Sequence, residues 1–387
     1  MSENPKRTIV LIFMGAYLPG FKGGGPVTSI KNMVDRLSGK IEFRIVAPDR
    51  DLFSDHPYSD VPKREWTILD KEKVLYLPPS VVNVLDVLVA LRHTQYDVVY
   101  LNSFFSPRYT IPVLVLRWLK LVPKKPVVLA VRGEFAPAAL DLKSRKKQVY
   151  LWFARKFGLL NDVVFHATNP IEEERIQAIL GAKVQTHLAP PLTKSVCTVE
   201  RTAVSTDGLL RVVFLGRIVP MKNLDYALEI LSEVQTPTEF TVYGPCEDDE
   251  YWVLCQRIIA KLPRHITIKY EGSIHPSKVR AILANFDLFF LPTRGENFGH
   301  VIAEALAAGC PVLISDQTPW KDLEVKMCGW AFPLSDRSSF INSIESMANM
   351  SYTDRIEMSI RSIAYAKDRD SVSDATRLNM RLFGVSD

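Results

Sequence analysis

Cysteine is scarce in this sequence, and no two cysteines have the spacing of a metal or redox motif. The five are scattered and form no C-x-x-C pair: Cys197, Cys246, Cys255, Cys310 and Cys328. This spacing argues against a disulfide framework and against a zinc site. Reduced thiols in a cytoplasmic setting are therefore expected.

Long apolar runs are missing as well. No segment reaches ~18 apolar residues without a charge, so no helix is expected to span a membrane. The apolar run Thr8–Met14 follows two basic residues, but it is too short for a secretory signal and no A-x-A site follows it. We expect this run to be the first β-strand of a folded protein.

Two motifs of known chemistry are absent or have another explanation. No G-x-G-x-x-G follows the first strand of either half, which argues against an NAD-dependent dehydrogenase. The acidic run 247–250 looks like a metal-binding cluster, but it stands at the start of a predicted helix, 251–260. The helix dipole explains acidic residues there, so no metal site is predicted.

The composition is that of a folded protein with two domains. The 387 residues are 47% hydrophobic and 24% charged, and this length exceeds one ordinary core. Strand-like and helical patterns alternate, apart from an irregular insertion at 49–70 and a Pro-, Thr- and Ser-rich break at 187–208. We therefore predict an α/β protein with two doubly wound parallel sheets, in domains 1–190 and 205–367.

Charge is divided unevenly between the two halves. Residues 1–185 carry a net charge of +9, whereas the remainder carries −4. A basic N-terminal half favours an acidic partner, either an anionic lipid surface or a substrate that bears phosphate.

The segment 287–315 carries most of the predicted chemistry. It is expected to form a strand, a loop at 293–299, an Ala-rich helix at 301–308 and a second strand. Ligands bind beyond the carboxyl ends of parallel strands, where this loop lies. Gly299 lets a phosphate approach the first turn of the helix, and Glu304 needs a hydrogen-bond partner, such as a ligand hydroxyl, among apolar neighbours.

These residues resemble the Glu-x7-Glu signature of family 4 glycosyltransferases, or glycosyl transferases group 1. The matching positions are Pro292, Glu296, Phe298, Gly299, Glu304, Ala305, Gly309, Pro311, Val312, Ser315 and Asp316. The resemblance implies the GT-B fold, with two Rossmann-like domains facing a central cleft and a C-terminal helix, about 368–387, packed back on the first domain. It places the donor sugar against Glu296, the diphosphate at Gly299 with Asn297 and Phe298 beside it, and the ribose at Glu304.

Two cations follow the first strand of the second half. Arg217 and Lys222 stand at the carboxyl end of that strand. One interpretation is that they only form ion pairs with surface acids, as such residues ordinarily do. They also resemble the Gly-Arg-x4-Lys element of the family, which holds the donor diphosphate. Charge grows on the diphosphate as the glycosidic bond breaks, so fixed cations there stabilise the transition state.

Other candidate residues lie in the first half. Gly23–Gly25 precede the first helix as a flexible turn or a phosphate loop, and the resemblance carries Gly24 and Gly25 over as donor contacts. Asn102 and Ser103 follow one predicted strand, and Arg132 and Glu134 follow another. Arg132 stands where the family often has histidine, and these four are candidate acceptor or sugar contacts.

The segment Lys143–Leu160 combines an apolar stripe with six cationic side chains. The stripe consists of Val149, Trp152, Phe153, Phe157 and Leu160. Two interpretations stay open: the stripe packs on its own sheet, or it rests on an anionic lipid surface.

Together these features predict a glycosyltransferase, and the family resemblance implies a retaining enzyme of the hexosyltransferase type. Its expected donor is a nucleotide diphosphate sugar and its acceptor a glycan or lipid-linked glycan, in bacterial surface polysaccharide assembly. No cofactor, metal or nucleic acid partner is expected, and the expected location is cytoplasmic, with peripheral contact to the inner face of the membrane. The alternatives are a nucleotide-sugar epimerase or hydrolase of the same fold, and a sugar-nucleotide-binding protein without catalysis.

Overall fold

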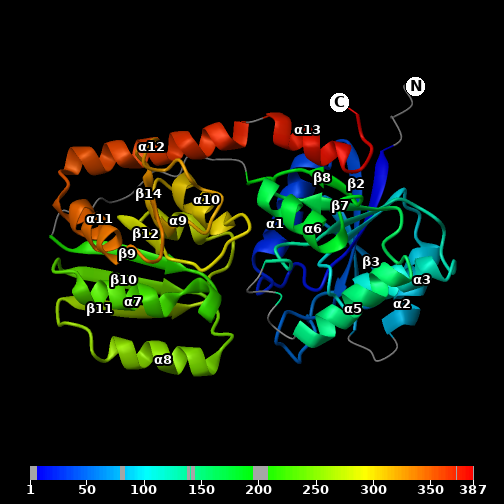
Figure 1. The fold of residues 1–387 in the computed structure, drawn as a ribbon, viewed down its shortest axis with the longest axis horizontal. Coiled ribbons are helices and arrows are strands. Elements are labelled where there is room, and N and C mark those ends of the chain that lie inside the picture. Colours follow the sequence, from blue (N-terminus) through cyan, green and yellow to red (C-terminus); the bar gives the residue numbers. More distant parts are fainter. Residues whose placement is uncertain are drawn as a thin grey trace. The chain divides into compact units, whose positions relative to one another are not determined.

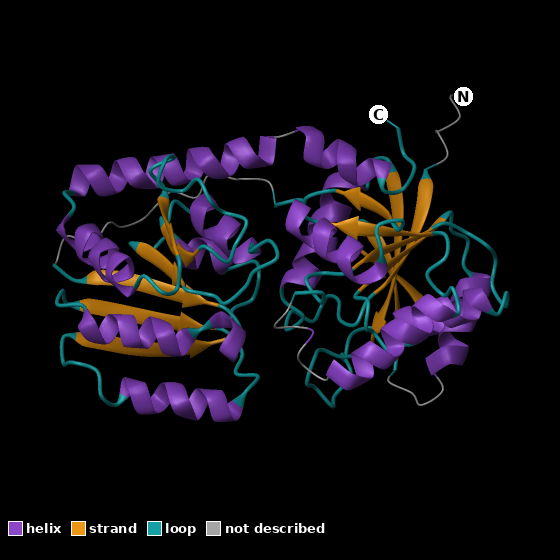
Figure 2. Cartoon of the chain, viewed as in Figure 1, coloured by secondary structure: helices purple, strands orange, loops and turns teal. Residues whose placement is uncertain are grey.

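The computed structural model describes residues 7–78, 83–136, 140, 144–194, 208–371 and 373–386. The chain divides into two compact units, Met1–Lys194 with Ser373–Asp387, and Ser195–Val372. Each unit is built on one β-sheet with helices packed on it (Figure 1, Figure 2). Most of the predicted break at 187–208 lies outside the described residues.

Unit 1 contains an eight-stranded sheet in the order β3-β4-β2-β1-β5-β6-β7-β8. The strands are β1 (Thr8–Phe13), β2 (Ile41–Pro48), β3 (Trp66–Leu69), β4 (Glu72–Leu77), β5 (Val98–Asn102), β6 (Val127–Ala130), β7 (Val163–Ala167) and β8 (Gln185–Leu188). All neighbours are parallel except β3 and β4, which pair antiparallel at the edge.

Side chains of this sheet are buried on both faces, because successive strand residues point to opposite sides. Leu11 and Phe13 of β1 join one core, whereas Val10 and Ile12 join the other. The first core is covered by α2 (Asn83–His93), α3 (Thr110–Trp118), α5 (Ser144–Lys156) and α6 (Pro170–Leu180). The second is covered by α1 (Gly25–Leu37) and α13 (Ser373–Arg381).

The first sheet departs from the predicted all-parallel arrangement at one edge. The predicted irregular insertion 49–70 ends in β3, whose four residues alternate between exposed and half-buried. An edge strand of this kind buries little apolar surface, so its sequence carries a weak strand signal. The strands β4, β8 and β14 also lie outside the predicted set.

Unit 2 contains a six-stranded parallel sheet in the order β11-β10-β9-β12-β13-β14. Its strands are β9 (Leu210–Leu215), β10 (Thr238–Tyr243), β11 (Ile266–Gly272), β12 (Leu288–Leu291), β13 (Val312–Ser315) and β14 (Gly329–Phe332). Its helices are α7 (Leu224–Glu233), α8 (Asp249–Ile259), α9 (Val279–Leu283), α10 (His300–Ala307), α11 (Arg337–Asn349) and α12 (Tyr352–Ser371), and η1 (Pro220–Lys222) is a short 3-10 turn.

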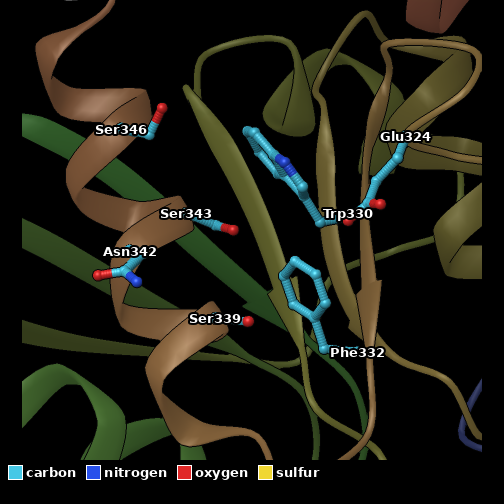
Figure 3. Close-up of a pocket in the computed structure, with 7 residues that line it drawn as sticks. All are labelled: Glu324, Trp330, Phe332, Ser339, Asn342, Ser343 and Ser346. Carbon is cyan, nitrogen blue, oxygen red and sulfur yellow. The ribbon is translucent and has the colours of Figure 1, made fainter.

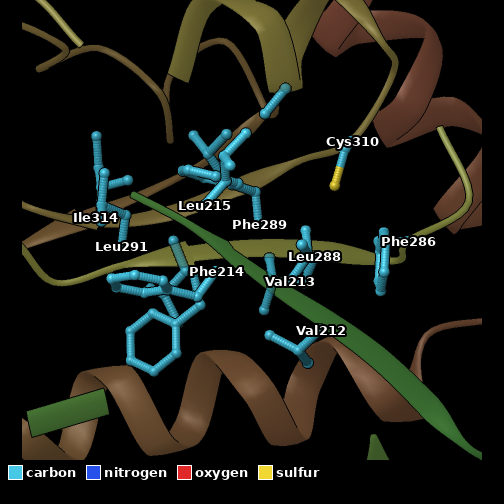
Figure 4. Close-up of a cluster of buried hydrophobic side chains, with 14 of the residues drawn as sticks. Val212, Val213, Phe214, Leu215, Phe286, Leu288, Phe289, Leu291, Cys310 and Ile314 are labelled. Atoms are coloured by element: carbon cyan, nitrogen blue, oxygen red, sulfur yellow. The ribbon is translucent and has the colours of Figure 1, made fainter. Parts of the chain in front are cut away.

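The middle of the second sheet is formed by apolar side chains of neighbouring strands. Val212 and Phe214 of β9 lie beside Leu288 and Phe289 of β12 in one buried cluster (Figure 4). Numbered along the chain, this sheet has the strand order 3-2-1-4-5-6 of doubly wound domains, so the predicted fold class is confirmed for unit 2. No helix among the described residues is both long and apolar enough to cross a bilayer.

Candidate functional site

The strand order of unit 2 determines where a ligand site is expected. The connections leave β9 and β12 toward opposite edges of the sheet, and these two strands are neighbours. A crevice forms at such a switch point, beyond the carboxyl ends of the two strands. The segments that follow β9 and β12 are 216–223 and 292–299, which contain most of the predicted donor residues.

Hydrogen bonds join these two segments. The Asn223 side chain donates to the Pro292 carbonyl at 2.9 Å and accepts from Nε of Arg294 at 2.8 Å. The hydroxyl of Thr293 donates to the Met221 carbonyl at 3.0 Å. Asn223 is 2% exposed and has a left-handed backbone, with φ of 61°. Asn223 therefore positions both segments. The residue type could have indicated this role, because asparagine is one of the few residues that adopt a left-handed backbone in a turn.

Lys222 and Glu296 are brought together by this arrangement. The Lys222 ammonium donates to Oε2 of Glu296, and the two side chains are 14% and 19% exposed. The backbone N–H of Glu296 donates to the Gln317 carbonyl at 2.9 Å, which holds the loop in place. A cation and a carboxylate thus form a partly buried ion pair beyond the ends of β9 and β12.

Arg217 lies on the other side of the loop after β9 and has a partner that the sequence did not reveal. Its Nη1 lies 3.0 Å from Oε2 of Glu247, in the loop after β10. The Arg217 side chain is 48% exposed, whereas that of Glu247 is 8% exposed. Oε1 of Glu247 is buried and has no hydrogen-bond partner in the protein. The close approach of the two loops requires a glycine, because a Cβ at Gly244 would lie 1.8 Å from the Gly216 carbonyl oxygen.

The remaining acids of the run 247–250 serve the following helix, as predicted. Asp248 caps α8 by accepting from the N–H of Tyr251 at 2.9 Å. Asp249 and Glu250 lie in the first turn of α8, where negative charge stabilises the helix dipole.

The N-terminus of α10 begins at Gly299, whose φ of 84° favours glycine. A Cβ there would lie 2.7 Å from Cδ1 of Ile302 and 3.1 Å from Cγ of Glu296. No side chain caps this helix, so its first turn faces the loop as a site suited to anions. Asn297 and Phe298 are half-buried in the same loop.

Trp320 contacts that loop through a hydrogen bond and a ring contact. Its indole Nε1 donates to the Phe298 carbonyl at 2.6 Å, and the two rings lie 5.8 Å apart. Trp320 is 1% exposed, so the loop 293–299 is held against a buried side chain. Glu304 lies half-buried on the second turn of α10, the helix that follows this loop.

In unit 1 the four candidate acceptor or sugar residues gather at the carboxyl ends of β5 and β6. Nε of Arg132 donates to Oδ1 of Asn102 at 2.7 Å. The Ser103 hydroxyl donates to Oε1 of Glu134 at 2.7 Å, and the Phe104 N–H donates to Oε2 at 2.5 Å. Burial raises the pKa of Glu134, while these donors oppose that rise. Ser103 and Arg132 both have positive φ, 110° and 55°.

A buried relay orients Arg132. Its Nη2 donates to the Tyr100 hydroxyl at 3.0 Å, and that hydroxyl lies 2.8 Å from Nδ1 of His166. Nε2 of His166 lies 2.8 Å from the Ala189 carbonyl, which only accepts, so the proton is on Nε2 and Tyr100 donates to Nδ1. Burial lowers the pKa of His166 to about 3, so its ring is neutral.

The glycine loop after β1 lies at the switch point of the first sheet, where β1 and β5 are neighbours. Gly24 has φ of 61°, with open space where a Cβ would stand, and Gly25 is the first residue of α1. The carboxylate of Asp51, a residue not predicted, accepts from the N–H of Phe21 at 3.1 Å and of Lys22 at 3.2 Å. Asp51 therefore shapes this loop from the segment that follows β2.

A separate hollow lies between β14 and α11 (Figure 3). It faces Trp330 and Phe332 on one side and three serines of α11 on the other. Its lining residues are Glu324, Trp330, Phe332, Ser339, Asn342, Ser343 and Ser346. None of these is a predicted site residue, and β14 is two strands from β12, so this hollow is separate from the candidate site.

Comparison with known proteins agrees with this geometry. Residues 210–350 match the family of glycosyl transferases group 1. The predicted resemblance to this group is therefore confirmed, whereas membership of family 4 stays a prediction.

Solved structures share the GT-B fold over nearly the whole chain. Sucrose-phosphate synthase from Thermosynechococcus elongatus is 13% identical, with a TM-score of 0.71 over 97% of this chain and 98% of that one. Anabaena Alr3699/HepE in complex with UDP and glucose is 14% identical, with a TM-score of 0.68 and the same coverage. WaaG, a glycosyltransferase involved in lipopolysaccharide biosynthesis, is 13% identical, with a TM-score of 0.65 and the same coverage.

A curated relative comes from a bacterial polysaccharide locus. The uncharacterised 41.2 kDa protein in the cps region of Klebsiella pneumoniae is 23% identical over 252 residues, which are 60% of this chain and 63% of the relative. The match thus spans less than two thirds of that protein. Together the family match and the fold support sugar transfer as the activity.

Proposed function

We propose that this protein is a retaining glycosyltransferase that moves a hexosyl group from a nucleotide diphosphate sugar to a hydroxyl acceptor. The observation that carries the proposal is the convergence of Lys222, Glu296 and Gly299 at the switch point between β9 and β12. Arg217 follows the same strand, β9. The match to glycosyl transferases group 1 covers all of these residues.

The proposed roles follow from the chemistry of the leaving group. As the bond between C1 of the sugar and the diphosphate oxygen breaks, negative charge grows on the diphosphate. Lys222, Arg217 and the first turn of α10 supply positive charge or N–H donors to that group, which lowers the barrier without a metal ion or other cofactor. The acceptor oxygen bonds to C1, and its proton passes to the departing diphosphate.

The two carboxylates divide the donor between them. Glu296 is ion-paired with Lys222 and faces the sugar, so it orients the reacting carbon. Glu304 lies on the second turn of α10 and accepts from the ribose hydroxyls. Asn297 and Phe298 contact the donor from the loop between them. Gly24 and Gly25 are proposed donor contacts on the sequence resemblance alone. Retention and membership of family 4 rest on the sequence resemblance.

The acceptor is proposed to be a glycan or lipid-linked glycan at the cytoplasmic face of a bacterial membrane, in surface polysaccharide assembly. The net charge of +9 in residues 1–185 supports an anionic acceptor. The relative in a cps region and the likeness to WaaG support a polysaccharide or lipopolysaccharide setting. Arg132, Asn102, Ser103 and Glu134 are the proposed contacts to the acceptor or the sugar.

A panel of nucleotide sugars tests the proposal. The matching donor, at 100 times its dissociation constant, is expected to stabilise the fold by ~2.7 kcal/mol in a thermal-shift assay. NMR of the transfer product should then show the anomeric configuration of the donor. If no nucleotide sugar in the panel stabilises the fold, the proposal is contradicted. Release of free sugar or of an epimer without transfer would indicate the hydrolase or the epimerase instead.

A further inference from the structure

One face of α5 is apolar and exposed. Val149 lies one turn before Trp152 and Phe153 on this helix, and the three are 67%, 56% and 39% exposed. The opposite side of α5 provides the packing instead, because Tyr150 and Leu151 pack on the core of unit 1. Of the two interpretations that the sequence left open, packing of the whole stripe on the sheet is therefore wrong for these three residues.

Aromatic rings extend this face to the end of α3. The ring of Phe157, 42% exposed, lies 4.4 Å from that of Phe153, 6.4 Å from that of Trp152 and 6.4 Å from that of Trp118. Trp118 is 45% exposed and is the last residue of α3. We call this set the aromatic surface: Trp118, Leu119, Leu121, Val149, Trp152, Phe153 and Phe157.

Cations greatly outnumber acids around the aromatic surface, where Asp162 pairs with Lys124 at 3.1 Å. The segments 117–126 and 144–160, which contain it, hold nine Lys and Arg residues and no Asp or Glu. Seven of these cations have exposed side chains: Lys120, Lys124, Lys125, Arg145, Lys146, Arg155 and Lys156. Nζ of Lys156 lies 4.7 Å from the centre of the Trp152 ring, so this cation lies directly against the aromatic surface.

We propose that the aromatic surface is a docking site for a bilayer of anionic phospholipid. Tryptophan and phenylalanine rings insert at the boundary between headgroups and acyl chains, while surrounding cations bind the anionic headgroups. A second copy of the chain fits poorly, since a twofold interface would bring the same cations of both copies face to face. The site uses no residue assigned to sugar transfer, so the two proposals can fail separately.

Co-sedimentation with vesicles tests the charge requirement. The whole protein should bind vesicles of equal parts phosphatidylcholine and phosphatidylglycerol at low salt, be released as salt rises, and bind pure phosphatidylcholine far less. The triple variant Arg145→Gln, Lys146→Gln, Lys156→Gln should lower the partition coefficient by roughly a hundredfold, at about fivefold per cation. Lys147 is left unchanged because its Nζ packs 5.0 Å from the Phe105 ring centre.

A matched control carries the same loss of charge elsewhere. Arg257, Lys261 and Arg264 are exposed on and after α8 in unit 2. Their triple change to Gln should leave vesicle binding unchanged. An equal fall in binding for both triple variants would overturn the proposed surface.

Insertion of the rings is tested by fluorescence. Brominated phospholipid in the vesicles should quench tryptophan emission, and most of this quenching should disappear in the double variant Trp118→Phe, Trp152→Phe. Because phenylalanine keeps the face apolar, that variant should still bind. Binding without quenching in the wild type, or no binding to anionic vesicles at low salt, would refute the proposal. So would a dimer, seen by analytical ultracentrifugation, that is lost in Trp152→Ser while vesicle affinity is absent.

Discussion

Two ion pairs at the ends of β9, β10 and β12 differ in the exposure of their cations. Lys222 is 14% exposed beside Glu296, whereas Arg217 is 48% exposed beside Glu247. Glu247 is 8% exposed and Glu296 19%, so either carboxylate would be left as an uncompensated charge if its cation were removed. Lys222 and Arg217 are therefore both expected to stabilise the local structure as well as to bind the ligand.

Removing either cation tests the leaving-group role. Arg217→Ala and Lys222→Ala are each expected to lower turnover by roughly a hundredfold or more, as when one preorganised transition-state donor is lost. Steady-state rates measure the effect, with circular dichroism to verify the fold. Lys269→Ala is the control, because Lys269 pairs with Glu239 between β10 and β11. Near-normal turnover in both variants would contradict the assigned role.

The two carboxylates of the Glu-x7-Glu spacing are expected to separate binding from transfer. Glu304→Gln should weaken binding of the free nucleoside diphosphate, because it removes the acceptor of the ribose hydroxyls. Glu296→Gln should leave that affinity nearly unchanged and slow transfer. Calorimetry with the nucleoside diphosphate measures the first effect, and equal affinity in wild type and Glu304→Gln would refute the ribose assignment.

The neutral His166 ring predicts a pH dependence of stability. Its pKa is lowered by burial from 6.5 to about 3, so the unfolded chain binds this proton and the folded chain does not between these values. Stability from this group is therefore complete above pH 6.5 and falls as pH decreases, by about 1.4 kcal/mol per pH unit.

Urea unfolding of wild type and His166→Asn over this range checks that expectation. The variant should lose that share of the slope, whatever its stability at neutral pH. An identical slope in both proteins would show that His166 is protonated in the fold and that the relay through Tyr100 has another arrangement.

Among the elements, the loop between β12 and α10 depends on a glycine in close surroundings. Gly299 has positive φ, and a Cβ there would contact both Ile302 and Glu296. Gly272 also has positive φ, 69°, but has open space around it. The two glycines therefore have similar backbone requirements and different surroundings.

Substitution by alanine separates these two effects. Gly272→Ala should cost about 1–2 kcal/mol of unfolding free energy from the left-handed backbone alone. Gly299→Ala should cost more and should also weaken donor binding, because Glu296 and the first turn of α10 must shift. Thermal unfolding and calorimetry measure both quantities, and equal effects of the two changes would show that the contacts of Gly299 are unimportant.

For the whole molecule, the end of the chain completes the core of the first unit. Phe383 is 3% exposed, and its ring lies 5.7 Å from that of Tyr100 and 6.3 Å from that of Phe43. Asn379 of α13 donates to the Pro190 carbonyl at 2.8 Å. Unit 1 is thus built from both ends of the sequence.

Phe383→Ala is expected to destabilise unit 1 by about 3–5 kcal/mol, the cost of removing a buried phenylalanine. Limited proteolysis followed by mass spectrometry should find new cleavage sites within residues 7–194, with those of 208–371 unchanged. Ile360→Ser, at a position 61% exposed on α12, is the control for loss of an apolar side chain. Uniform loss of protection in both units would contradict an independent first core.

Local sequence determined the elements whose signals are local. Buried strands such as Thr8–Phe13 and Leu288–Leu291 were predicted because continuous apolar runs end at turn residues. Gly299 and the acids that begin α8 were also predictable, since a left-handed backbone and a helix dipole act within one turn. The spacing of Glu296 and Glu304 is also a local feature of the sequence, and it supported the family resemblance.

Only the tertiary structure decided which distant residues are neighbours and which faces stay uncovered. Strand order brings β9 beside β12, and so joins Lys222 to Glu296 across 74 positions and gives Asn223 its partners. The exposure of Trp152 likewise depends on what packs against α5, because a helical stripe of the same sequence can face a sheet or solvent. Pairing and burial are set by contacts between remote segments, whose free energies no local pattern contains.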